Sequence, residues 1–307
     1  MLIMDMFNIR NIQGWLSPAS VVVKLRGGIG NQMFQYAMGC AVAFRNNARL
    51  KIEILSGFSS DPCREYKLKH FNIKADFASP YESYMCWLGS KRNSIDRFIT
   101  KHRLFGGSPY ISENNTTYNP IISSLRIKSR TYLDGYWQSE KYFEDFADII
   151  REHFTLKEEF CETSRKLAIQ IEGHNSICLH VRRGDYANDP KIHARHGTLD
   201  TSYYENAIKY FNSIVYNPHY FIFSDDLNWA QNNIIIRNPK LFVGYDSPTF
   251  DYEDLILMSL CKHFIIANSS FSWWGAWVSK NVEKIVIAPR KWFSSVDMNI
   301  EDLISPG

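Results

Sequence analysis

The sequence lacks the features that mark membrane, secreted and repeat proteins. No stretch of its 307 residues reaches the ~18 consecutive apolar residues of a membrane span. The apolar start has no basic leading region and is interrupted by Asp5, so we do not expect a signal peptide. The six cysteines are widely scattered, without the paired spacing of a zinc site, and there is no internal repeat or low-complexity tract. We therefore expect a cytoplasmic protein with reduced thiols.

An excess of charge of one sign is also missing. The 35 Lys and Arg residues against 32 Asp and Glu residues leave a net charge of +3. This balance argues against a nucleic-acid partner, although it suits a local anionic ligand or a weak contact with an anionic membrane surface. The content of 45% apolar and 22% charged residues is ordinary for a globular protein, and the length exceeds that of one typical domain.

The second half of the chain alternates between expected strands and expected helices. Such alternation builds a parallel sheet with helices on both faces, so we expect residues 166–307 to form a Rossmann-like domain. The expected strands are 176–181, 219–223, 240–243, 263–267 and 284–287, and the expected helices are 202–214, 226–233, 252–261 and 271–280.

The first half is less regular. We expect strands at Val21 and at 130–133, and helices at 33–44, 140–153 and 157–172, whereas the stretch 56–130 gives no clear assignment. Residues 20–165 are assigned to a first α/β domain and residues 1–19 to an N-terminal extension.

Two adjacent arginines stand directly after the expected strand 176–181, within the segment His-Val-Arg-Arg-Gly-Asp-Tyr. An open α/β sheet binds its ligand at the carboxyl ends of its strands. A guanidinium group offers a fixed fork of donors that matches phosphate oxygens, so Arg182 and Arg183 suggest a pyrophosphate site. The alternative is a pair of solvated arginines, one of them paired with Asp185.

A glycine-rich turn joins the strand at Val21 to the helix at 33–44. Gly28 and Gly30 let the backbone approach a ligand closely, and the helix start presents free N–H groups to an anion. The turn lacks the third glycine of the dinucleotide fingerprint and the Gly-Lys-Ser/Thr of a P-loop. A tight strand-to-helix turn without a ligand is the alternative.

Small polar residues and three tryptophans follow the expected strand 263–267. Small hydroxyl side chains cap a helix and leave N–H groups for phosphate. We expect at least two of the three tryptophans to pack the helix onto the sheet. The segment reads Asn268, Ser269, Ser270, Phe271, Ser272, Trp273, Trp274, Gly275, Ala276, Trp277.

Together these segments resemble the α-1,2-fucosyltransferases of glycosyltransferase family 11, bacterial branch. The resemblance runs from about residue 20 to about residue 295, through the motifs at 27–36, 135–143, 180–186, 223–226, 257–259 and 268–274. It implies a GT-B-like fold of two Rossmann-like domains with the active site in the interdomain cleft. It also implies an inverting transfer of L-fucose from GDP-β-L-fucose to the 2-hydroxyl of a terminal β-galactoside, in O-antigen or capsule synthesis.

The chemistry of such a transfer suggests roles for the motif residues. Departure of GDP builds charge on the β-phosphate, and the sequence contains no Asp-x-Asp motif that would hold a metal there. We expect Arg182 to stabilise this charge without a metal or other cofactor, and Arg183 to bind phosphate or hold the loop. The further donor-side candidates are Gly28, Gly30, Asn31, Gln32, His180, Ser224, Asp225, Asp226, Asn268, Ser269, Ser270, Phe271 and Ser272.

Some donor-side candidates have more than one interpretation. Asn31 would touch the fucose or the pyrophosphate. Asp225 and Asp226 suit guanine or ribose, but Asp226 is more simply explained as the cap of the following helix. Asp185 and His180 are the candidate bases, yet either can instead orient an arginine or contact the nucleotide, and a dissociative reaction needs no strong base.

The candidates on the acceptor side lie in two places. Tyr136, Trp137 and Gln138 follow the strand 130–133, with core packing as the alternative for Trp137. His193 and His196 lie in the long polar stretch 187–200, which we expect to be a functional or solvated loop; without a third ligand they do not predict zinc.

Two other functions stay open at this point. One is a fucosyltransferase of another linkage, such as the α-1,6 type, and the other is a non-catalytic module that binds a nucleotide sugar or a glycan. The intact Arg182, Arg183 and Asp185 argue against loss of catalysis. The sequence leaves open the oligomeric state and a peripheral contact of the apolar start with the inner membrane.

Overall fold

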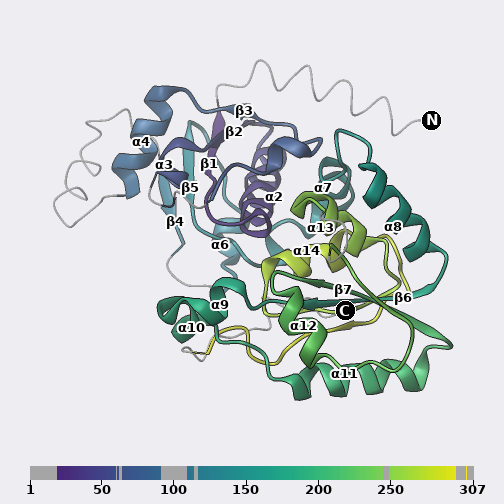
Figure 1. Ribbon diagram of the computed structural model, residues 1–307. Coiled ribbons are helices and arrows are strands. Elements are labelled where there is room, and N and C mark those ends of the chain that lie inside the picture. The colour runs from purple at the N-terminus through teal and green to yellow at the C-terminus, as the bar shows by residue number, and fades with distance from the viewer. Residues whose placement is uncertain are drawn as a thin grey trace, which may run out of the picture. The chain divides into compact units, whose positions relative to one another are not determined.

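The computed structural model describes residues 19–59, 61, 64–90, 109–113, 117–244, 249–294 and 302. The chain divides into two compact units, Met1–Phe154 and Thr155–Gly307, and each contains one five-stranded sheet (Figure 1). Every strand pairing within the described residues is parallel. The two Rossmann-like folds expected from the sequence are therefore present, the first of them in a stretch whose pattern alone did not show it.

The observed boundary precedes the expected one at residue 165. The helix α8 (Glu162–Glu172) packs against β6 and α13 of the second unit, so the linker ends before it. Of the expected N-terminal extension, residues 1–18 lie outside the described chain. Ala19 belongs to the first unit, because it is buried and its carbonyl accepts a hydrogen bond from the Arg49 N–H at 3.2 Å.

The first unit is built around a central strand that is buried on both faces. The β-branched run Val21, Val22 and Val23 forms this strand and is fully buried. The strand order is β3-β2-β1-β5-β4. The elements are β1 (Ser20–Lys24), α2 (Ile29–Arg45), β2 (Arg49–Glu53), α3 (Leu55–Phe58), η1 (Leu68–His70), β3 (Asp76–Phe77), α4 (Pro80–Ser90), β4 (Tyr110–Ser112), α6 (Pro120–Ser123), β5 (Thr131–Asp134), η2 (Glu140–Tyr142), η3 (Glu144–Phe146) and α7 (Ala147–His153).

The second unit has the strand order β10-β9-β6-β7-β8, which is the order of a five-stranded Rossmann sheet. The elements after α8 are β6 (Asn175–Val181), α9 (Gly184–Asn188), α10 (Pro190–His196), α11 (Thr201–Ile214), β7 (Pro218–Ser224), α12 (Leu227–Asn233), β8 (Lys240–Phe242), α13 (Asp251–Ser259), β9 (His263–Ile265), α14 (Ser270–Val278) and β10 (Val286–Ile287).

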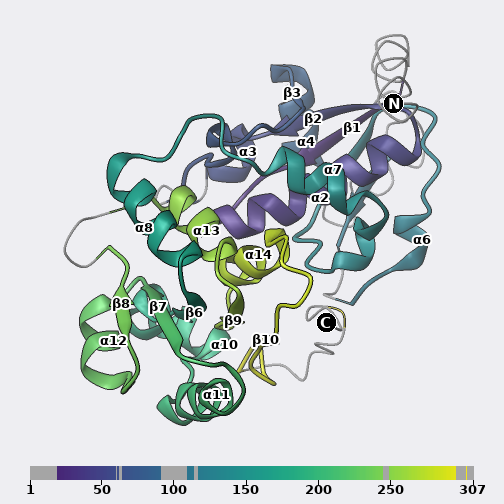
Figure 2. The ribbon, with the colours of Figure 1, turned by 90° about the vertical axis from the view of Figure 1, so that its right-hand side faces the viewer.

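Side chains alternate across the second sheet, as the period of a strand requires. Ile177, Leu179 and Val181 of β6 pack in one core cluster with α11 and α12. His180 of β6 lies against Phe271 of α14, on the opposite face. Figure 2 shows α11 and α12 against one face of this sheet and α8, α13 and α14 against the other.

The three tryptophans of α14 confirm the expected packing role. Trp273, Trp274 and Trp277 are all buried, and their ring centroids lie 4.9 to 6.1 Å apart.

No helix in the described part of the chain is both long and apolar enough to span a bilayer.

Two expectations for local structure were wrong. The stretch 187–200 is not a loop, because Asp189 caps α10 by accepting from the N–H groups of Lys191 and Ile192, and Pro190 stands at its first position. The expected helix 140–153 is broken into η2, η3 and α7. Phe143 interrupts it with a non-helical backbone (φ −141°, ψ 5°) and is fully buried beside Phe34.

Candidate active site

The strand order brings the sequence motifs of the second unit to one edge of its sheet. β6 and β9 are hydrogen-bonded neighbours, and the strand order reverses between them, which is where such sheets bind ligands. Arg182 follows β6, and Asn268 follows β9. The register that pairs Val181 with Ser224 brings Asp225, the residue after β7, to the same edge.

Arg182 is held between two carboxylates. Its Nη2 lies 2.6 Å from Oδ1 of Asp185, and its Nη1 lies 2.8 Å from Oδ2 of Asp225. The guanidinium carbon also lies 5.1 Å from the ring centroid of Tyr186. Two of the five guanidinium donors are used in this way, so the others remain for a ligand. Of the two roles open to Asp185, the geometry favours orienting Arg182.

Arg183 holds the loop that follows β6. Its backbone N–H donates to Oδ1 of Asp225 at 2.8 Å, its guanidinium carbon lies 4.0 Å from the ring centroid of Trp229, and its Nε lies 3.8 Å from Oδ2 of Asp226. The next residue must be small, because a Cβ on Gly184 would lie 2.6 Å from Oδ2 of Asp225. Of the two roles expected for Arg183, the observed contacts support holding the loop.

Asp226 caps α12, as its sequence position suggests. Its carboxylate accepts from the Trp229 N–H at 3.1 Å, and its own N–H donates to Oγ of Ser224 at 2.9 Å. Ser224 and Asp226 therefore shape the turn. Both oxygens of Asp225 contact arginine groups, so its contact with guanine or ribose stays a prediction.

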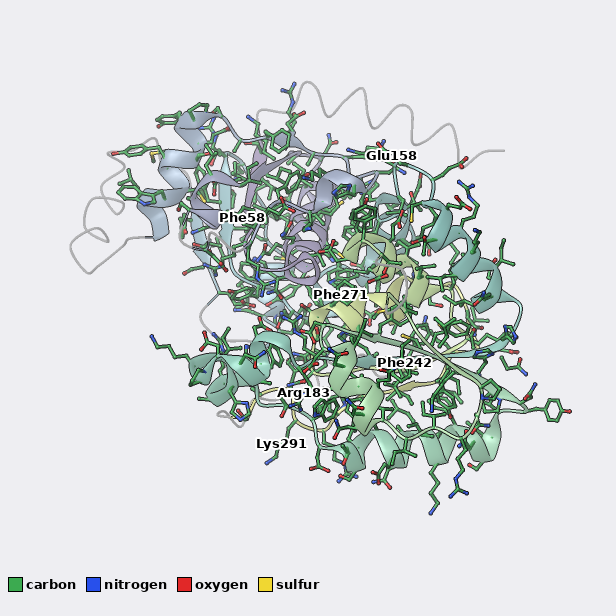
Figure 3. The ribbon with its side chains drawn as sticks, in the orientation of Figure 1. Phe58, Glu158, Arg183, Phe242, Phe271 and Lys291 are labelled. Atoms are coloured by element: carbon green, nitrogen blue, oxygen red, sulfur yellow. The ribbon has the colours of Figure 1, made fainter. Side chains whose placement is uncertain are left out.

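His180 is a buried, neutral histidine. It is 3% exposed, its ring centroid lies 5.6 Å from that of Phe271, and its Nδ1 finds no hydrogen-bond partner among the described residues. Burial, with a smaller contribution from the charge of Arg182, lowers the pKa of His180 to about 3. A group with this pKa is a weak base, so the geometry favours nucleotide or water contact over proton abstraction. Figure 3 labels Arg183, directly after β6, and Phe271, in the first turn of α14.

The start of α14 divides into structural and accessible residues. Oγ of Ser269 accepts from the Phe271 N–H at 3.3 Å and caps the helix. Ser272 is 1% exposed, and its Oγ accepts from the Ala267 N–H, which argues against the predicted ligand contact. Ser270 and Phe271 are partly exposed and remain candidates for the donor.

Asn268 also has a structural role. It is 1% exposed, and its side-chain amide donates to the carbonyls of His196 and Trp292 at 2.9 and 3.3 Å. It thereby ties the end of α10 to the segment after β10. Its Oδ1 finds no partner within the described residues.

The two histidines expected on the acceptor side belong to α10. The ring centroid of His196 lies 4.6 Å from that of Tyr186 and 5.0 Å from that of Phe293, and burial lowers its pKa to about 4. His193 is exposed, and its Nδ1 lies 2.8 Å from the Tyr186 carbonyl. Both histidines thus support the segment that carries Tyr186, and their contact with an acceptor stays a prediction.

The glycine turn of the first unit is held by buried amides. Gln32 is fully buried, and its amide donates to the carbonyls of Gly27 and Glu65 while accepting from the Lys67 N–H. These contacts occupy the polar atoms of Gln32 with backbone groups, which argues against its predicted donor contact. Gly27 has a φ of +75°, and a Cβ there would lie 2.9 Å from Nδ2 of Asn31. Gly30 is buried within α2, whereas Gly28 caps its start and is partly exposed.

Two predicted residues of the first unit meet at the ends of β1 and β5. These strands are neighbours at the point where the strand order reverses. The side-chain amide of Gln138 donates to Oδ1 of Asn31 at 2.8 Å. Tyr136 lies under the guanidinium of Arg26, with 4.7 Å from Cζ to the ring centroid. Trp137 is fully buried in the core, which was the alternative for it.

A buried ionic cluster at this edge was not found from the sequence. Asp134 is 8% exposed and lies 3.5 Å from Nζ of Lys24 and 3.3 Å from Nη1 of Arg26, and it accepts a hydrogen bond from the hydroxyl of Tyr110. The sequence signal for this cluster is the charged residue at the end of each of two apolar strands, Lys24 in β1 and Asp134 in β5. Among the described residues, no group of three or more His, Cys, Asp or Glu side chains could hold a metal ion.

The chain belongs to glycosyl transferase family 11. The model of this family matches residues 118–306. The chain is 32% identical to the O-antigen biosynthesis glycosyltransferase WbnK of Escherichia coli over 289 residues, which cover 88% of this chain and 94% of that relative. It is 34% identical to the alpha-1,2-colitosyltransferase of Escherichia coli over 286 residues, which cover 92% of this chain and 95% of that relative. The family resemblance is confirmed, and the chain is a glycosyltransferase.

Comparison with solved structures supports the fold. A mutant of Arabidopsis thaliana FUT1 in complex with GDP superposes with a TM-score of 0.51 at 10% identity, over 90% of this chain and 71% of that one. At this identity the likeness shows the two-domain GT-B fold alone.

We predict that His180 stays uncharged across the physiological pH range. Because its folded pKa of about 3 lies below the ordinary value of 6.5, the unfolded chain binds the additional proton between these values. The contribution of the neutral His180 to the free energy of unfolding is therefore complete above pH 6.5. It is lost as the pH falls from 6.5 toward 3. Nitrogen-resolved NMR of the histidine rings should show the neutral form of His180 at pH 5. A midpoint near 6.5 would contradict the burial.

Proposed function

We propose that the protein transfers L-fucose from GDP-β-L-fucose to the 2-hydroxyl of a terminal β-galactoside, with inversion to an α-1,2 linkage. The observation that carries this proposal is Arg182, fixed by Asp185 and Asp225 at the strand ends where a family 11 chain would bind its donor. The resemblance of the motifs to the α-1,2-fucosyltransferases supplies the sugar and the linkage.

The reaction forms a bond between the acceptor oxygen and the anomeric carbon and breaks the bond from that carbon to the β-phosphate oxygen. Negative charge therefore develops on GDP as it leaves. Arg182 keeps unused donors for this charge while two carboxylates hold its guanidinium in place, so little reorganisation is needed. The acceptor proton leaves to a weak base or to solvent, because Asp185 is engaged with Arg182 and His180 is a weak base.

A second donor has a specific observation in its favour. The alpha-1,2-colitosyltransferase shares 34% of its residues with this chain over most of both lengths. Colitose is L-fucose without the 3-hydroxyl, so one missing hydroxyl contact distinguishes the two donors. A site that hydrogen-bonds this hydroxyl would reject the deoxy sugar strongly, whereas an apolar site would discriminate weakly.

We further propose a role in O-antigen synthesis on the cytoplasmic side of the membrane. The relative WbnK is named as an O-antigen biosynthesis glycosyltransferase, which supports a role in this process. The donor then is soluble GDP-fucose, and the acceptor carries a terminal β-galactose.

The test of the function is a transfer assay with both donors. Purified protein is incubated with GDP-fucose or GDP-colitose and a panel of β-galactosides, and the product linkage is determined by NMR. We expect an α-1,2-linked fucosyl product. Efficient transfer from GDP-colitose alone would establish the second donor, and a 6-linked product or absence of transfer would refute the proposed linkage or activity.

We predict that Arg182→Lys lowers kcat on the order of 10²-fold or more, the effect of losing one donor to a developing oxyanion. Lysine keeps the charge, but its single nitrogen cannot contact Asp185, Asp225 and a phosphate in the same geometry. The matched control is Arg165→Lys on α8, where Arg165 forms an exposed ion pair with Glu159; this variant should leave kcat unchanged. A kcat of R182K within about threefold of wild type would rule out the phosphate role.

We predict that transfer does not depend on a divalent metal. Two arginines follow β6, and the sequence has no Asp-x-Asp motif, so positive charge for the leaving group comes from the protein. Initial rates should be equal with and without excess EDTA. A loss of activity that Mn²⁺ or Mg²⁺ restores would show that this expectation is wrong.

A further inference from the structure

The turn after β5 contains a strained residue. Trp137 has a φ of +54°, in the left-handed region that bulky side chains rarely adopt. Such a conformation costs on the order of 1–3 kcal/mol and persists only where the surroundings enforce it. Burial is one constraint, since the Trp137 ring is fully buried with its centroid 5.7 Å from that of Tyr142.

The second constraint is the carboxylate of Glu113, which no motif marks in the sequence. One of its oxygens accepts the N–H of Tyr136 at 2.6 Å, and the other accepts the N–H of Trp137 at 3.0 Å. Gly135 allows this approach, because a Cβ there would lie 2.5 Å from Cβ of Glu113 and 2.7 Å from the Trp137 ring. Glu113 thus fixes two consecutive peptide groups of the turn.

The turn determines where Gln138 and Tyr136 lie. Gln138 follows the strained residue directly and donates to Asn31 in the first turn of α2. Both amides are partly exposed, as is Tyr136. An amide pair beside an aromatic ring offers donors, acceptors and an apolar face, which are the groups that bind a sugar.

The charges bordering the turn favour a neutral ligand. Lys24 and Arg26 both contact Asp134, and Arg26 also interacts favourably with the charge of Glu113. These two cations are therefore matched by two carboxylates. A neutral galactoside can bind beside this charge-balanced turn without displacing these ion-pair partners.

We propose that Glu113 is a positioning residue for the acceptor: it holds the turn 135–138 so that Tyr136 and Gln138 face the galactoside. This inference rests on the proposed transferase function. Because Glu113 acts through the turn, its loss should weaken acceptor use and leave nucleotide binding, placed with Arg182 in the second unit, unchanged.

The test is a double-mutant cycle of Glu113→Gln and Gln138→Ala. Glutamine keeps the size of Glu113, but its NH₂ group cannot accept a backbone N–H, so one of the two bonds is lost. We expect each single variant to lower kcat/KM for the galactoside on the order of tenfold, mainly through the acceptor KM. The double variant should lose less than the sum of the two single losses, because part of the effect of Glu113 is exerted through Gln138. The Kd of GDP, from calorimetry, should change less than about twofold.

The control for general destabilisation is Glu82→Gln, a buried carboxylate of the first unit that, like Glu113, accepts a backbone N–H, here at the start of a helix. It should leave the acceptor KM unchanged. Unchanged acceptor kinetics in E113Q, additive losses in the double variant, or an equal loss of GDP affinity would overturn the proposal. If E113Q does not fold, Glu113→Asp supplies the same readouts. Wild-type protein without transferase activity would refute the proposed function instead.

Discussion

The site of the second unit depends on the register between β6 and β7. Because Val181 pairs with Ser224, the next residues, Arg182 and Asp225, lie beside each other where the two strands end. A shift by one residue would turn the side chain of Asp225 to the other face of the sheet. Arg182 would then lose one carboxylate, and the Arg183 N–H would lose its acceptor. The seven-residue pairing of two buried strands therefore fixes the guanidinium before any ligand arrives.

In the first unit, strand register also brings a cation beside a carboxylate, but there the ion pair is buried. Val23 pairs with Leu133, so Lys24 lies beside Asp134 at the ends of β1 and β5. This pair is buried, with side-chain exposures of 7% and 9%, whereas the Arg182–Asp225 pair is 21% and 27% exposed. Burial of both charges carries a desolvation cost that only a fixed geometry offsets. The buried pair thus ties the ends of β1 and β5 together, and the accessible pair keeps donors for a ligand.

The sequence predicted the strands of the second sheet because their apolar runs end in polar turns. The helix cap of Asp226 was also predicted, and the pairing of Asp185 with an arginine was one of two alternatives, since these are contacts over three residues. It could not predict that Gln32 binds the Glu65 carbonyl or that Glu113 binds the turn at Tyr136, because these contacts join segments 33 and 23 residues apart without a periodic pattern. The α10 helix was missed although Asp189 and Pro190, a cap and a first-turn proline, signalled its start.

The environment of Arg182 also constrains what the site can stabilise. Two arginines face three carboxylates, Asp185, Asp225 and Asp226, so the cluster does not present a strong positive potential to a distant anion. The cluster instead acts over a short distance, because the two carboxylates hold the Arg182 guanidinium and its remaining donors in a fixed orientation. Such donors interact more strongly with a phosphate oxygen as its charge grows, which is the condition for lowering a barrier rather than only binding the ground state. With Arg182 in the role proposed here, affinity for the donor would come largely from the nucleoside and the sugar, and the carboxylates that offset the charge of Arg182 would also keep its guanidinium aligned.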